Sequence, residues 1–227
     1  MLSTCRELSE LVLEYVSGFS DVGPLGLLPS LQALHLENLR NVDDFSGLGL
    51  SSSLKYLSID GTIDWSQPVS SLEFLGSMEA LEHLRLMHVR TRAVPTPLMG
   101  LLKLKKIRKI DFSRTAFSLD VYAWLEAKLS HLEGSMLKPS VRFLAKDREI
   151  ATRDIRSQMP AEEFAKLSGL YVAEDGRRYE KVPHQAVLLG KGERYVSGSE
   201  QQVGAKCDAH DKRYRALVKE MEQQPPQ

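Results

Sequence analysis

The sequence has little cysteine, no excess of charge of either sign and no long hydrophobic run. Its two cysteines, Cys5 and Cys207, lie near opposite ends of 227 residues, whereas a disulfide framework needs more cysteines at closer spacing. No stretch approaches the roughly 20 apolar residues that cross a bilayer, and the first residues do not have the pattern of a signal peptide. These absences predict a cytoplasmic protein in a reducing compartment, with no membrane association.

The balance of charge excludes a further class of partner. Thirty Lys and Arg residues stand against thirty Asp and Glu residues, so nothing in the chain as a whole favours a polyanion such as nucleic acid. What is present is typical of a globular protein, with 42% hydrophobic and 26% charged residues. A chain of this length and composition is expected to form one or two domains with a substantial core.

One short pattern recurs along the first half of the chain. LEHLRL at residues 81–86 spaces its leucines three and then two apart, and related segments start at Leu8, Leu31, Leu54 and Ile107. The steps are 23, 23, 27 and 26 residues, inside or near the leucine-rich repeat period of about 20–29 residues. In that architecture each LxxLxL segment forms a short strand of a parallel sheet and points its leucines into a solenoid.

The segments between these strands carry a second apolar cluster. They read FSDVGPLGLLPSL, NVDDFSGLGLSSSL, QPVSSLEFLGSMEAL and VPTPLMGLLKLKKI. Together with the strands they resemble the internalin-like class of bacterial leucine-rich repeats, over about residues 8–117. The resemblance implies a bacterial protein that binds another protein through the concave face of its sheet. One departure is the family's asparagine ladder at the ninth repeat position, which is replaced here by Val16, Leu39, Thr62, Val89 and Thr115. Turn hydrogen bonds must therefore be satisfied in another way.

The fold class expected is an α/β solenoid, a leucine-rich repeat with short parallel strands on its concave face, followed by a small α+β module. Residues 1–135 are assigned to the solenoid, with about five repeats and a closing amphipathic helix over 119–132. Residues 136–227 are assigned to the C-terminal module, for which no family resemblance is found. Its expected elements are a strand at 141–145, a short helix after Pro160, hairpins turning at Asp175–Gly176 and Gly190–Gly192, and a helix of about twenty residues after Ser199.

This last helix carries an apolar seam with steps of four and three residues, formed by Val203, Cys207, His210, Tyr214, Leu217 and Met221. The seam is expected to pack on the solenoid or on the two hairpins. Cys207, Asp208 and His210 raise the hypotheses of catalysis and of zinc binding. Helical phase places Cys207 and His210 on the packed seam, however, where cysteine behaves as a small hydrophobic residue. We therefore expect no enzyme activity, no metal and no cofactor.

The concave face can be written as columns, because equivalent positions of successive repeats lie about 4.8 Å apart in a parallel sheet. The columns run from acidic in the early repeats to mostly basic in the later ones, with Asp111 as the exception. Acidic side chains are expected to face basic groups of a partner, basic ones to face acidic groups, and Tyr56 and Met87 to form an apolar centre. The predicted partner-binding residues are Glu14, Glu37, Tyr56, Asp60, His83, Arg85, Met87 and Lys109.

The function expected is protein–protein interaction, as an adaptor, an inhibitor or a toxin-neutralising protein. Two alternatives stay open: the substrate-recruiting part of an enzyme whose activity lies in the C-terminal module, and a structural fragment of a longer repeat protein. The second alternative arises because no cap precedes Leu8. Two smaller features also allow alternatives. Trp65 is either a binding anchor or a cover for the repeat edge. The second feature is a modest basic patch or a solvated hairpin face, formed by Arg177, Arg178, Lys191 and Arg194. The acidic residues among these cations favour the solvated hairpin face.

Overall fold

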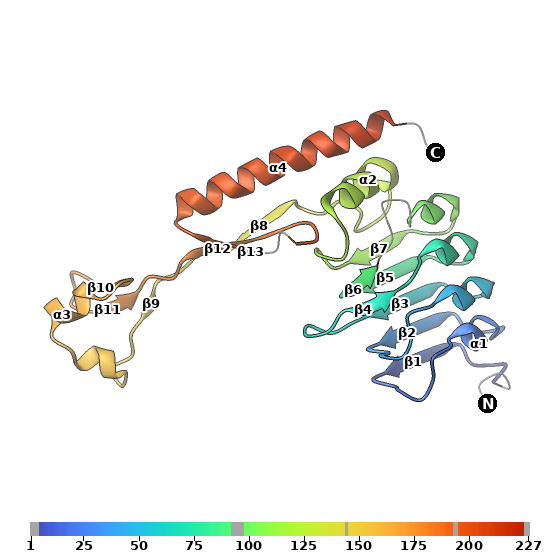
Figure 1. The fold of residues 1–227 in the computed structure, drawn as a ribbon, viewed down its shortest axis with the longest axis horizontal. Coiled ribbons are helices and arrows are strands. Elements are labelled where there is room, and N and C mark those ends of the chain that lie inside the picture. The colour runs from blue at the N-terminus through green and yellow to red at the C-terminus, as the bar shows by residue number, and fades with distance from the viewer. Residues whose placement is uncertain (1–4, 92–97, 144, 193–194, 225–227) are drawn as a thin grey trace. The chain divides into compact units, whose positions relative to one another are not determined.

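A computed structural model describes residues 5–91, 98–143, 145–192 and 195–224 (Figure 1). Five short strands form a parallel sheet in sequence order: β1 (Glu10–Glu14), β2 (Ala33–Glu37), β3 (Tyr56–Asp60), β5 (His83–Met87) and β7 (Lys109–Phe112). Each predicted LxxLxL segment supplies one of these strands. The predicted positions and parallel arrangement of the repeat strands are therefore confirmed.

The segments that return from each strand to the next contain one short helix each: α1 (Gly23–Gly26), η2 (Ser46–Leu50), η3 (Glu73–Ser77) and η4 (Met99–Lys103). Each of these helices buries at least one leucine toward the sheet. Neighbouring returns pack closely, and a Cβ atom at Gly26 would lie only 2.2 Å from the backbone oxygen of Gly47. Glycine at this position therefore permits the spacing of the repeats.

One apolar core fills the space between the sheet and the returns. The inward residues of β2, β3 and β5 are buried, as Leu34, Leu57 and Leu84 show with 0% exposure, whereas Leu11 and Leu13 of β1 are only partly buried. Helix α2 (Leu119–Leu129) adds Tyr122 and Leu125 to this core after the last strand. The closing helix predicted over 119–132 is present and ends three residues earlier.

The repeat pattern does not indicate a further pair of short parallel strands, β4 (Gln67–Val69) in the third return and β6 (Val89–Thr91) at the start of the fourth. Gln67 is 1% exposed. Its Oε1 atom accepts a hydrogen bond of 2.9 Å from the Leu39 amide, and its Nε2 atom donates one of 2.7 Å to the Val42 carbonyl. A side chain from the next repeat thus satisfies turn groups that an asparagine ladder would otherwise bind.

The C-terminal elements are β8 (Ser140–Phe143), β9 (Arg148–Glu149), η5 (Ile155–Gln158), α3 (Ala161–Lys166), β10 (Leu170–Val172), β11 (Arg178–Glu180), β12 (His184–Leu188), β13 (Tyr195–Gly198) and α4 (Glu200–Gln223). They form two three-stranded antiparallel sheets, β10-β11-β9 and β13-β12-β8. Gly176 and Gly192 adopt the positive φ values, 81° and 90°, that the two predicted hairpin turns require. The predicted strand, short helix, hairpins and long helix are all present.

The chain divides into two compact units. The first contains the residues up to Lys138, the turn after β12, and α4 from Lys212 onward; the second contains Pro139–Leu188 and Tyr195–Asp211. In the first unit Tyr214 of α4 joins the core beside Tyr122, and in the second Val203 and Cys207 pack with Ala186, Leu188 and Val196. The seam thus packs on the core of the first unit and, in the second unit, on one of the two predicted hairpins, β12–β13. The sequence-based boundary near residue 135, as a limit of independently folding domains, stays a prediction.

Within the part of the chain that the structure describes, no helix has the length and apolar character needed to span a membrane.

Candidate functional site

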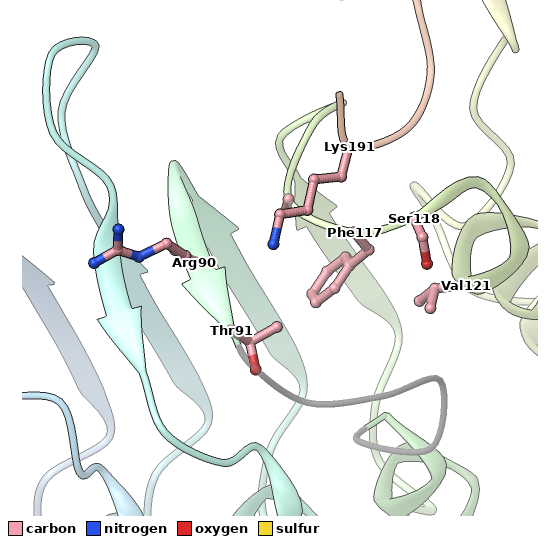
Figure 2. Close-up of a pocket in the computed structure, with 7 residues that line it drawn as sticks. Arg90, Thr91, Phe117, Ser118, Val121 and Lys191 are labelled. Atoms are coloured by element: carbon pink, nitrogen blue, oxygen red, sulfur yellow. The ribbon is translucent and has the colours of Figure 1, made fainter. Parts of the chain in front are cut away.

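A pocket of about 480 Å³ lies in the first unit, beside β6 and the start of α2 (Figure 2). Phe117 and Val121 give it an apolar wall, and Ser118 and Lys191 add polar groups. Arg90 also lines it, but in Figure 2 the Arg90 guanidinium extends away from Lys191. The two cations therefore do not converge on one point, as an anion site would require.

A larger surface is the face of the parallel sheet that points away from the core. Successive residues of a strand point to opposite faces, so the third, fifth and seventh repeat positions point outward when the leucines point inward. We call this surface the open face. It consists of Glu10, Val12, Glu14, Ala33, His35, Glu37, Tyr56, Ser58, Asp60, His83, Arg85, Met87, Lys109 and Asp111. Strand register pairs equivalent positions of neighbouring repeats, as in Glu14 with Glu37 and Glu37 with Asp60. The predicted columns are therefore present.

Asp60 is the one buried member among the predicted partner-binding residues, with 3% exposure. Its carboxylate accepts hydrogen bonds from Arg85 Nε at 2.9 Å, Ser58 Oγ at 3.0 Å and the Met87 amide at 3.3 Å. The expectation that Asp60 faces a partner's basic group is revised accordingly, because Arg85 of the same chain occupies that place. Arg85 stays half exposed at the surface above it.

The later repeats form a second polar network across β3, β5 and β7. The His83 Nε2 and Asp111 Oδ2 atoms are 2.8 Å apart, and the Tyr56 ring meets the His83 ring edge-on at 4.9 Å. Lys109 Nζ lies 3.1 Å from Glu133 Oε1 and 3.8 Å from Asp111 Oδ2. Hydrogen bonding to Glu133, and then the charge of Asp111, raise the pKa of Lys109, so this lysine stays charged. These contacts hold the predicted side chains His83, Lys109 and Tyr56 in defined positions.

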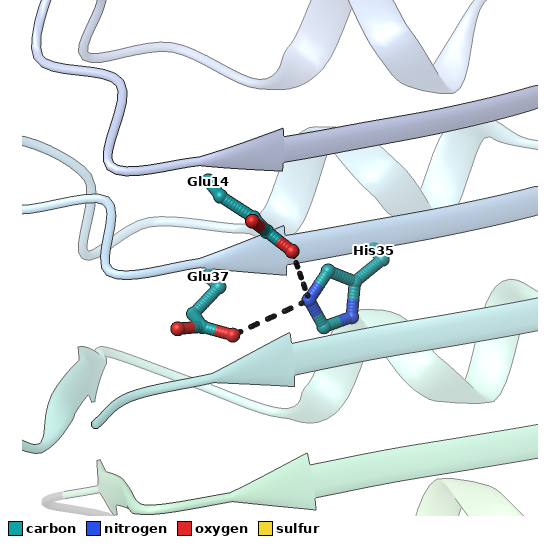
Figure 3. Close-up of side chains that lie close together, drawn as sticks. All are labelled: Glu14, His35 and Glu37. Carbon is teal, nitrogen blue, oxygen red and sulfur yellow. Dashed lines mark ion pairs between the residues drawn. The ribbon is translucent and has the colours of Figure 1, made fainter. Parts of the chain in front are cut away.

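The early repeats present a different group, in which Glu14 of β1 and Glu37 of β2 converge on His35 (Figure 3). His35 Nε2 lies 3.7 Å from Glu14 Oε1 and 3.6 Å from Glu37 Oε2. Beside this group, Val12 and Tyr15 are 61% and 64% exposed. Desolvation, followed by the charge and hydrogen bond of Glu37, raises the pKa of Tyr15 above its usual value. The acidic end of the open face is thus also partly apolar.

Sequence reasoning placed Val12 in a column without assigning it a role, and it did not consider Tyr15 as a surface residue. Tyr15 follows β1 at the eighth repeat position, where it has a φ of 56°. Asn38 and His88 occupy the same repeat position with φ values of 53°. Three of the five repeats thus share a left-handed backbone at this position, whereas Gly61 and Arg114, at the same position of the third and fifth repeats, do not have a positive φ.

The remaining sequence hypotheses concern side chains that the structure gives local roles. Cys207 is fully buried in the apolar cluster of the second unit. Arg178 donates hydrogen bonds to the backbone oxygens of Arg156 and Met159, and Arg177 pairs with Asp175. Arg194, the other member of the proposed basic patch besides Lys191, lies outside the described residues. No convergent basic surface follows from these contacts.

The Trp65 side chain is half-buried in the third return. The Arg40 guanidinium lies 5.8 Å from the centre of its ring, and the Trp65 amide bonds to the Thr62 hydroxyl at 3.1 Å. Gly61 allows this loop to close, because a Cβ there would lie 2.5 Å from the Trp65 carbonyl oxygen. Of the two alternatives for Trp65, these contacts favour a cover over the repeat.

Comparison with known proteins gives a partial structural likeness. No family model and no curated protein matches the chain. Among solved structures, internalin C2 of Listeria monocytogenes aligns with 20% identity and a TM-score of 0.40, over 58% of this chain and 52% of the internalin. The internalin inlF of the same organism aligns with 21% identity and a TM-score of 0.41, over 58% of this chain and 41% of that one. The chain thus matches about half, or less, of the length of each internalin.

Proposed function

We propose that this chain is a leucine-rich repeat protein that binds another protein through the open face of its parallel sheet. The observation that carries the proposal is the arrangement of that face. Five strands place charged and aromatic side chains in columns at the surface. Two ion pairs between neighbouring strands, and a third from Lys109 to Glu133, hold several of these side chains there. The proposed action is reversible association, which suits an adaptor, an inhibitor or a neutralising protein.

The composition of the open face supports an interface. Interface centres favour aromatic residues, methionine and arginine, with polar residues around them. Tyr56, Met87 and Arg85 lie on adjacent strands at the middle of the sheet, and the charged residues of β1, β2 and β7 flank them. Side chains that are already ordered lose less conformational entropy on binding, so the contacts of Tyr56 and Arg85 favour affinity.

A truncation experiment tests the proposal. The open-face variant carries Tyr56→Ala and Met87→Ala. These substitutions remove the apolar centre and leave every charged residue of the open face unchanged. Its matched control carries Leu50→Ala and Leu102→Ala, which remove two exposed leucines, 64% and 40% accessible, from the returns. All three proteins are immobilised and used to capture proteins from a bacterial lysate, and the captured protein is then titrated against each in solution.

We expect one protein to bind the wild type and the control variant and to bind the open-face variant at least about tenfold more weakly, since truncated interface centres commonly cost more than 1 kcal/mol. Equal binding by all three proteins would place the interface elsewhere. Selective loss in the control variant would place it on the returns.

A further inference from the structure

Three potential metal ligands from two strands meet at the acidic end of the open face. Glu14 and Glu37 are Cα partners in the register of β1 and β2, and His35 stands two residues before Glu37 on the same face of β2. Their donor atoms all lie within 4.8 Å of one another (Figure 3). The side chains are 53%, 26% and 21% exposed for Glu14, Glu37 and His35, so a solvated ion can reach them.

The distances within this group match shared coordination better than hydrogen bonding. His35 Nε2 lies 3.7 Å and 3.6 Å from the two carboxylate oxygens, beyond the 2.7–3.2 Å of an N–H···O bond. Around a tetrahedral zinc ion with bonds of about 2.0–2.2 Å, neighbouring ligand atoms are about 3.4 Å apart. Small side-chain rotations would therefore bring all three donors to one ion.

The charges of the group also favour a divalent cation. Like charges directly opposite one another on neighbouring strands destabilise a sheet. The third acid of the same column, Asp60, has Arg85 as a cationic partner. Among the described residues, the structure gives Glu14 and Glu37 no ion-pair partner other than His35. Two carboxylates and a neutral imidazole together balance the charge of one M²⁺ ion.

We propose that Glu14, His35 and Glu37 bind a divalent transition-metal cation, with Zn²⁺ as the ion that fits best. One imidazole nitrogen and two carboxylate oxygens form a donor set that zinc accepts, whereas calcium and magnesium prefer oxygen alone. Three protein ligands leave a coordination position for water or for a donor from another molecule. The site needs no partner protein and so does not rest on the proposed function.

Calorimetric titration of ZnCl₂ into the metal-stripped full chain tests the site. All proteins carry Cys5→Ser, because Cys5 is an exposed free thiol and a thiolate is itself a zinc ligand. We expect one zinc ion per chain, and we expect His35→Gln, Glu14→Gln and Glu37→Gln each to weaken its binding by at least about tenfold, since even outer-shell changes cost 10–100-fold in affinity. Co²⁺ in place of Zn²⁺ gives a second readout, visible absorption bands that the same three variants lose.

His83→Gln is the matched control. His83 is the other histidine on the open face, and its Nε2 atom is already within hydrogen-bond distance of Asp111. We expect this variant to bind zinc and cobalt as the wild type does. The proposal is overturned if the wild type binds no more zinc than His35→Gln, if any of the three ligand variants keeps full affinity with a native circular dichroism spectrum, or if His83→Gln loses binding equally.

Discussion

The Nε atom of Arg85 donates a hydrogen bond of 2.9 Å to the Oδ2 atom of Asp60, and this contact joins β5 to β3 across the open face. The Asp60 side chain is 4% exposed, whereas that of Arg85 is 40% exposed. A buried carboxylate that loses its cationic partner keeps the cost of desolvation without its compensation. Arg85 therefore stabilises the sheet in addition to contributing to the candidate surface.

Arg85→Gln is expected to lower the free energy of unfolding by about 1–3 kcal/mol, because the buried Asp60 carboxylate loses a charged hydrogen bond. Chemical denaturation followed by circular dichroism measures the change. Arg90→Gln is the control, since Arg90 is exposed on β6 and its loss should cost less than about 0.5 kcal/mol. Equal costs for the two variants would contradict the role assigned to the Asp60 contact.

Leu57→Ala and Leu84→Ala are each expected to cost about 2–5 kcal/mol, because both leucines are fully buried and truncation leaves a cavity. Denaturation curves for the two variants and for Leu50→Ala, which truncates a leucine that is 64% exposed, provide the measurement. A cost under about 1 kcal/mol at both buried positions would be incompatible with their place in the core.

The repeat strands could be predicted from sequence because the signal is local and periodic. Leucines at fixed spacing identify the inward positions, and the constant register of a parallel sheet then places the outward columns, including the pairing of Glu14 with Glu37. The alternation does not determine which outward residues pair with each other. Asp60 and Arg85 occupy different columns and meet diagonally, so their contact depends on side-chain conformation rather than on spacing.

Sequence spacing was equally unable to predict side-chain contacts at the acidic end of the open face. Glu14, Glu37 and His35 were all placed on the open face from sequence, yet no metal was expected, since column positions do not give the distances between donor atoms.

Gln67 was missed for another reason. Its hydrogen bonds reach back 25 and 28 residues to Val42 and Leu39, and only the longer third step of the repeat hints at an inserted element.

Gln67→Met tests the replacement of the asparagine ladder. Methionine keeps the length of the side chain but removes both hydrogen-bonding groups, which leaves the buried Leu39 amide and Val42 carbonyl unpaired. We expect a loss of about 1–3 kcal/mol in the free energy of unfolding. Gln201→Met, on the exposed first turn of α4, is the control for the change of residue type. If both variants are equally stable, other groups satisfy the turn.

Asp154 provides a test by acid titration in the second unit. Hydrogen bonds from the Arg156 side chain, and next from the Arg156 amide, lower the pKa of Asp154 from 3.8 to about 2. A folded-state pKa below the unfolded value means that this carboxylate contributes stability above pH 3.8, and the contribution is lost as the pH falls through about 2. NMR titration of the side chain measures this pKa directly.

Arg156→Gln should raise the pKa of Asp154 only part of the way to 3.8, because the backbone amide of residue 156 still donates. Arg153→Gln removes a neighbouring exposed charge and should leave the pKa of Asp154 near its wild-type value. An Asp154 pKa that does not change in Arg156→Gln would show that the arginine side chain does not hold the carboxylate in solution.

Tyr214 links α4 to α2 and gives an alkaline counterpart. Its hydroxyl lies 2.7 Å from Glu126 Oε2, and burial, followed by the hydrogen bond and charge of Glu126, raises the pKa of Tyr214 above its usual value of 10. A phenol whose folded-state pKa is raised ionises first in the unfolded chain. The stability of the wild type should therefore fall as the pH rises above 10.

Tyr214→Phe removes this ionisable group, so the stability of that variant should fall less steeply above pH 10 than that of the wild type. It should also lose about 0.5–1.5 kcal/mol at neutral pH, the typical net contribution of one hydrogen bond. Tyr195→Phe, at a tyrosine that is 77% exposed, should match the wild type in both respects. Thermal unfolding of the three proteins between neutral and alkaline pH measures both effects. Parallel pH profiles for wild type and Tyr214→Phe would mean that Tyr214 ionises as readily in the folded chain as in the unfolded one. In that case α4 does not hold the Tyr214 side chain buried against α2.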